Sequence, residues 1–108
     1  MSSTTITRGN SHETFYIGPS LTPAAVASYT SAVQTFTVPG LQTTDIVLVI
    51  GATGAQTAGI TPGEADCYTA NVLSLQFLNA TAASATPAQG AYAIQIVRTE
   101  GPMPTTAV

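Results

Sequence analysis

The chain has 108 residues, enough for one domain, and only 6% of them are charged, against about 25% in an ordinary soluble domain. Its two cations, Arg8 and Arg98, cannot form the basic patch that binds nucleic acid or anchors a protein to acidic lipid. The single cysteine excludes an internal disulfide, and no apolar run is long enough for a membrane-spanning helix.

The N-terminal part of the sequence predicts an arm. Residues 1–14 are polar, rich in Ser and Thr and without periodicity, and they lack the pattern of a signal peptide. The apolar cluster Phe15-Tyr16-Ile17 ends at Gly18-Pro19. A short helix could begin at Thr22-Pro23, but β-branched residues follow within about two turns. We expect residues 1–22 to form a flexible arm.

The next two segments have the pattern and length of β-strands. Residues 33–38 alternate, with Gln34, Phe36 and Val38 on one face, and they stop at the turn dipeptide Pro39-Gly40. Residues 45–50 are apolar on both faces. This second pattern predicts a central strand.

Glycine and proline divide the rest of the chain. Residues 51–63 hold four glycines and Pro62, which predicts a long loop with a short strand over residues 57–61. Asn71 marks a tight turn. Further strands are predicted over residues 66–70, 72–78 and 91–98, with a loop over 81–90 and a C-terminal tail over 101–108 that begins Gly101-Pro102-Met103-Pro104.

Short strands separated by turn residues indicate an all-β fold. We expect a small antiparallel β-sandwich, of the jelly-roll or immunoglobulin-like type, over residues 23–100. The inward positions of the alternating segments predict a core made of Phe36, Val38, Val47, Val49, Leu73, Leu75, Phe77, Tyr92, Ile94 and Ile96.

One motif suggests nucleotide chemistry. An apolar strand runs into Gly51-Ala-Thr-Gly54, as at the start of a dinucleotide-binding unit, where glycines let the backbone approach a pyrophosphate at a helix N-terminus. Thr57 stands where the third glycine is needed, and Pro62-Gly63 prevents the helix that should follow. We therefore interpret the segment as a loop between two strands.

The other reactive residue types are too few to predict a site. His12-Glu13 has no second histidine to complete a zinc motif, and Glu64 with Asp66 is better read as a solvated acidic turn than as a cation clip. Cys67 has no activating neighbour and is expected to be buried. Asn79-Ala-Thr81 matches a glycosylation acceptor, which matters only in a secretory compartment. We expect no catalytic, metal-binding or cofactor-binding residues, and no enzymatic activity.

The aromatic residues give the best candidates for a contact surface. Tyr16 and Tyr29 lie outside the strongest strand patterns, so we predict an interface made of Phe15, Tyr16, Ile17 and Tyr29. A sugar-binding platform of tyrosines and phenylalanines is an alternative, although Phe77 and the last tyrosine fall in phase with core positions.

The order of strands and turn dipeptides carries a resemblance. It runs through residues 34–41, 43–49, 59–60, 72–81, 86–87 and 92–98, with a departure at residues 50–56. This pattern resembles the small β-sandwich virion proteins of tailed bacteriophages, including capsid decoration or cement proteins. The resemblance implies a homotrimer on the capsid exterior that binds and stabilises the shell of major capsid protein. It implies no cofactor, no nucleic acid and no membrane.

Two kinds of alternative stay open. Within the same class, the protein is a tail, neck or fibre component of a phage. In a different class, it is a carbohydrate-binding β-sandwich module, which would expose two or three coplanar aromatic rings, and the absence of tryptophan argues against it. In each phage case we expect synthesis in the host cytoplasm.

Overall fold

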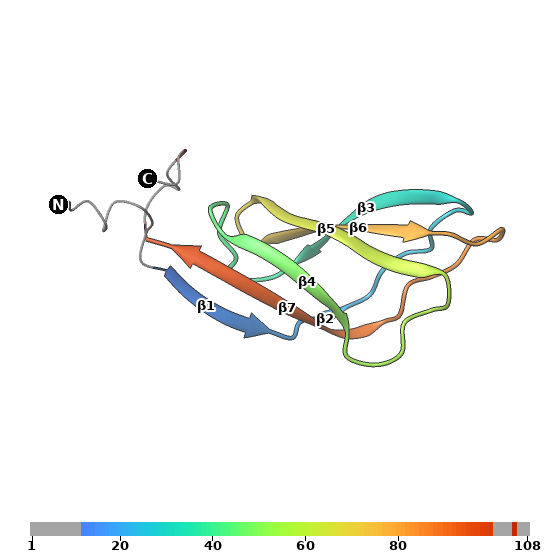
Figure 1. Ribbon diagram of the computed structural model, residues 1–108, viewed down its shortest axis with the longest axis horizontal. Helices are drawn as coiled ribbons and strands as arrows, with labels where there is room; N and C mark the ends of the chain where they lie inside the picture. Colours follow the sequence, from blue (N-terminus) through green and yellow to red (C-terminus); the bar gives the residue numbers. More distant parts are fainter. Residues whose placement is uncertain (1–11, 101–104, 106–108) are drawn as a thin grey trace.

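The computed structural model describes residues 12–100 and residue 105, and these residues form strands, turns and loops without a helix (Figure 1). The strands are β1 (His12–Ile17), β2 (Ser20–Leu21), β3 (Thr30–Thr37), β4 (Ile46–Ala52), β5 (Ile60–Thr69), β6 (Val72–Asn79) and β7 (Gly90–Thr99). The predicted all-β fold is confirmed.

The strands form two antiparallel sheets that pack against each other. In the first sheet β7 is central, with β1 and β2 on one side of it and β4 on the other. In the second sheet the order is β3-β6-β5. β4 also runs beside β5, so the two sheets approach each other along that side (Figure 1). This arrangement is the predicted small β-sandwich.

Part of the predicted arm belongs to the sandwich. Residues 12–17 form β1 and pair with β7 from His12 opposite Thr99 to Ile17 opposite Ile94, and β2 pairs with the start of β7. The domain therefore begins before the boundary that we placed after residue 22. The strand signal in the sequence is weak here, because just two residues of β1, Phe15 and Ile17, face the core. Thr14 and Tyr16 point outward, and the aromatic Tyr16 makes residues 15–17 look like an apolar cluster. Residues 1–11 of the arm and most of the tail over 101–108 lie outside the described residues.

The prediction that residues 45–50 form a central strand covered on both faces is wrong. Among the strands that the structure describes, β4 pairs with β7 alone. Val47 and Val49 pack against the core, but Ile46, Leu48 and Ile50 are exposed. Packing among residues 12–100 therefore does not explain the apolar residues on the outer face.

The loop predicted over residues 51–63 is shorter than expected. β5 begins at Ile60 and continues through Pro62 and Gly63, where the pairing with β6 shifts register before Ala65. A proline is tolerated here because β5 is an edge strand of its sheet and because a bulge relaxes the pairing. The tight turn at Asn71 is confirmed, with this residue in the left-handed region at φ 69°.

The short helix considered at Thr22-Pro23 does not form. Residues 22–29 run between β2 and β3, held by an isolated bridge between Val26 and Ala85. The Gln34 side chain binds this segment twice, because its amide donates to the Ala24 carbonyl and its oxygen accepts from the Ala24 N–H. These bonds replace those that a helix would supply.

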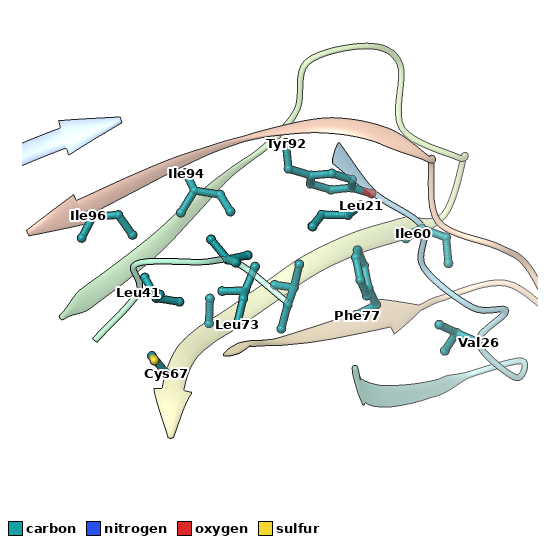
Figure 2. Close-up of a cluster of buried hydrophobic side chains, with 13 residues drawn as sticks. Leu21, Val26, Leu41, Ile60, Cys67, Leu73, Phe77, Tyr92, Ile94 and Ile96 are labelled. Carbon is teal, nitrogen blue, oxygen red and sulfur yellow. The ribbon is translucent and has the colours of Figure 1, made fainter. Parts of the chain in front are cut away.

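The core lies between the two sheets (Figure 2). Seven of the ten predicted core residues are buried, and the other three, Phe36, Val47 and Val49, are partly buried and pack against them. Phe77 and Tyr92 meet edge to face across the sheets, with ring centroids 6.1 Å apart. The structure adds core residues that have no strong pattern in the sequence: Leu21, Val26, Leu41, Ile60, Ala65 and Cys67.

Candidate functional site

The strongest charged contact serves the fold. Arg98 on β7 donates from Nε to Asp45 Oδ1 (2.8 Å) and from Nη2 to Asp45 Oδ2 (2.7 Å) and to the Gly40 carbonyl (3.0 Å). Its guanidinium lies 5.2 Å from the centroid of the Phe15 ring. The hydrogen bond from Arg98 holds the pKa of the buried Asp45 carboxyl below its usual value. This pair ties β1, β7 and the turn before β4 together.

A groove of about 750 Å³ lies between β4 and β5, beside the end of β7, and its lining combines four acidic residues with threonines and apolar side chains. Glu64 and Asp66 belong to β5 and not to the acidic turn that we predicted. The Tyr68 hydroxyl donates to Asp66 (2.9 Å), and this bond raises the pKa of Tyr68. Over residues 12–100 and 105, no three His, Cys, Asp or Glu side chains gather as a metal-binding group.

The glycine motif spans the end of β4 and the start of the loop that leads to β5, so it lies between two strands, as predicted, although its first two residues are part of the strand. Gly51 lies in β4 at a bulge, and the chain after Gly54 enters β5 instead of a helix. The Gln56 side chain anchors the loop: its oxygen accepts from the Ala88 N–H, and its amide donates to the Tyr92 hydroxyl. Its polar atoms thus hold the loop against β7.

Asn79 is buried and its side chain is fully engaged. The amide donates to the carbonyls of Val26 and Ala83, and the oxygen accepts from the N–H and the hydroxyl of Thr81. In the folded domain this nitrogen is therefore closed to a glycan, although the sequence matches an acceptor. Cys67 is buried as predicted, and His12 is exposed at the start of β1.

The four predicted interface residues are not brought together. Phe15 and Ile17 turn inward and pack against the core. Tyr16 is exposed on the outer side of β1, and Tyr29 is exposed in the turn before β3. Tyr29 has φ 49°, a left-handed conformation that is uncommon for a bulky residue.

The outer side of the first sheet is a continuous apolar surface. Cross-strand partners share a face, and the register places Tyr16, Gln95 and Leu48 in one row and Thr14, Val97 and Ile46 in the next. The exposed fractions of the large side chains are 66% for Tyr16, 42% for Ile46, 57% for Leu48 and 59% for Ile50. We define the apolar face as Thr14, Tyr16, Ile46, Leu48, Ile50, Ala93, Gln95 and Val97.

The second sheet exposes a smaller group of apolar side chains along β3, next to a shallow pocket that Val33 lines together with Glu64, Asp66 and Tyr68. Val33 and Leu78 lie diagonally across from each other, since Ser31 pairs with Leu78 and Val33 pairs with Gln76. Tyr29 lies in the turn before β3, where its N–H donates to the Thr81 carbonyl. We call Tyr29, Val33 and Leu78 the tyrosine patch. In the described part of the chain, the exposed tyrosines 16, 29 and 68 come from three different elements.

Sequence reasoning missed Ile46, Leu48 and Ile50 as surface residues. A strand that is apolar on both faces has the same pattern whether its outer side is covered by its own chain or by another molecule. Because residues 46–50 are apolar throughout, the sequence held no signal that could separate the two cases.

Comparisons of this chain with protein-family models, with curated proteins and with solved structures found no match. The described residues include no helix that could cross a membrane.

Proposed function

We propose that this protein is a virion structural protein of a tailed bacteriophage, a head decoration protein that binds the shell of major capsid protein. The observation that carries the proposal is the exposure of large apolar side chains on the outer sides of both sheets. Contiguous exposed apolar surface marks a binding site for other protein more often than it serves a free monomer. The resemblance of the strand and turn pattern to phage decoration proteins supports the same function.

Two apolar surfaces on opposite sheets suit a protein that contacts a neighbouring copy and a shell together. The chain has few charges for steering or for paired contacts, so its affinity must come from apolar area and from repetition. Copies joined to each other present several weak sites to a symmetric lattice, which raises the overall affinity without new contacts. We assign the shell contact to the tyrosine patch.

The test is binding of the purified protein to particles of the phage that carries its gene. We expect saturable binding with a fixed number of copies per capsomer, measured by co-sedimentation and by cryo-electron microscopy. Val33→Asp should weaken binding at least tenfold, because it places a carboxylate in an apolar contact. Gln89→Asp adds the same charge in an exposed loop and should bind as the unchanged protein does.

Other locations of the protein would overturn the proposal in different ways. A few copies at the tail, neck or fibres would retain a virion role and exclude decoration of the head. Absence from particles at every concentration tested, with the sandwich folded, would exclude the virion role itself.

A further inference from the structure

In the described part of the chain, the outer side of the first sheet carries one basic side chain, His12, at the start of β1, and no acidic side chain. Among the described residues, Asp45 is buried against Arg98, Glu64 and Asp66 lie on β5 of the other sheet, and Glu100 follows the end of β7. Glu13 pairs with Arg98, and residues on the same rung of a sheet share its opposite side, away from Tyr16 and Leu48. Two copies of this acidic chain, with formal net charge −3, can therefore meet through this face without opposing like charges.

The polar group at the middle of the face is self-complementary. Gln95 lies on the central strand β7, between Tyr16 on β1 and Leu48 on β4. A primary amide has two N–H donors and a carbonyl acceptor, so it can bond to a copy of itself. A contact around a two-fold axis brings a residue near its own copy when that residue lies close to the axis. An axis near Gln95 would satisfy both amides.

The area of the face is sufficient for a small specific interface. Tyr16, the three exposed aliphatic side chains of β4 and the half-buried residues between them offer about 500–600 Å² per copy. Two copies would bury about 1,000–1,200 Å², which is at the lower limit for a specific protein–protein interface. Twisted sheets of this kind pack face to face at about 10 Å, with the strands of the two sheets rotated by about 30°.

We infer that the apolar face is the contact between two copies of this chain, packed sheet against sheet around a two-fold axis near Gln95. The inference rests on the proposed function, because it assigns one surface of the virion protein to self-association and leaves the tyrosine patch for the shell. It replaces the trimer expected from the resemblance with a two-fold pair as the unit that binds. A surface whose described residues include no acidic side chain, the self-complementary amide and the area together favour a second copy as the occupant.

The first experiment measures mass in solution by sedimentation equilibrium. We expect twice the chain mass of 10.9 kDa for the unchanged protein. Leu48→Asp should weaken the association at least tenfold, because two carboxylates would enter an apolar contact. Val33→Asp places the same charge at an equally exposed aliphatic position of the other sheet and should leave the pair intact. Circular dichroism checks that both variants keep the fold.

The second experiment tests the axis directly. Cys67 is buried, so a cysteine introduced by Gln95→Cys is the accessible thiol of the described domain. Mild oxidation should link two copies of this variant covalently, whereas Val33→Cys under the same conditions should stay unlinked. Failure of Gln95→Cys to cross-link while the unchanged protein is a pair would overturn the position of the axis.

The outcomes separate this inference from the proposed function. A protein of single-chain mass that still decorates particles, or a Leu48→Asp variant that loses only particle binding, overturns the two-fold contact and retains the virion role. A mass of three chains also overturns it and supports the expected trimer. A pair that dissociates with Leu48→Asp but never binds particles supports the contact and overturns the proposed function.

Discussion

At the scale of single residues, a few polar side chains hold loops to strands inside a chain that is otherwise poor in charge. Asn79 joins the segment before β3 to the loop after β6 through four hydrogen bonds. Arg98 joins the Gly40 carbonyl to Asp45 and lies over Phe15. All buried side-chain nitrogen and oxygen atoms of the described residues have a partner, as a stable interior requires.

The Asp45–Arg98 pair should make stability depend on pH. The folded-state pKa of Asp45 lies below its ordinary value of 3.8, so the pair stabilises the fold above that value and loses its effect as the pH falls through the folded pKa. Asp45→Asn should lower the free energy of unfolding at pH 7 by about 1–2 kcal/mol. Below about pH 4, the free energy of unfolding of this variant should fall less steeply with pH than that of the unchanged protein. Urea unfolding at several pH values measures both effects.

The matched control for that experiment is Glu64→Gln, which removes an exposed carboxylate of β5. Its stability should follow the pH dependence of the unchanged protein. Equal slopes below pH 4 for Asp45→Asn and the unchanged protein would show that the ion pair does not contribute to acid unfolding.

At the scale of elements, the path of β5 depends on a close contact at the residue that precedes it. Gly59 has φ 82°, and a Cβ at this position would overlap Thr81 Cγ2 in the loop after β6. The Gly59 carbonyl also accepts from the Ala80 N–H, which fixes the two loops side by side. Because the two loops approach so closely, β5 pairs with β6 from its first residue, Ile60, which is buried in the core.

Gly59→Ala should therefore destabilise the domain by about 1–3 kcal/mol, through the overlap and through the left-handed backbone. Thr81→Ser removes the methyl group and retains the hydroxyl that donates to Asn79. We expect Gly59→Ala to cost less in the Thr81→Ser background, because only the backbone term remains. Urea unfolding of the four proteins gives the coupling. Identical costs in both backgrounds would exclude the overlap as the cause.

At the scale of the whole molecule, the described residues form a packed core between two sheets, and each sheet has an outer side that no other described element covers. The core residues Phe77 and Tyr92 close the space between the sheets, while Leu48 and Val33 lie on opposite outer surfaces. The N-terminal residues enter at His12, opposite Thr99 at the end of β7. Among the described residues, the first strand begins at His12, so a deletion that stops at residue 11 removes none of the seven strands.

Deleting residues 1–11 should leave the sandwich folded and weaken particle binding at least tenfold, if the segment adds contact area on the shell. The deletion stops before His12 because residues 12–14, which we had assigned to the arm, pair with β7. Circular dichroism measures the fold, and co-sedimentation with particles measures binding. Unchanged occupancy on the particles would show that the sandwich alone accounts for particle binding.

The sequence by itself determined the strands and inward faces of residues 33–38, 72–78 and 91–98, because side chains alternate along a pleated backbone. The tertiary structure decided which strands are neighbours, and therefore which apolar residues are covered. Ile46, Leu48 and Ile50 are exposed because, among the described elements, β4 pairs within its sheet with β7 alone and nothing covers its outer side. The contact of Asp45 with Arg98, 53 residues apart, likewise follows from strand order, which local periodicity does not encode.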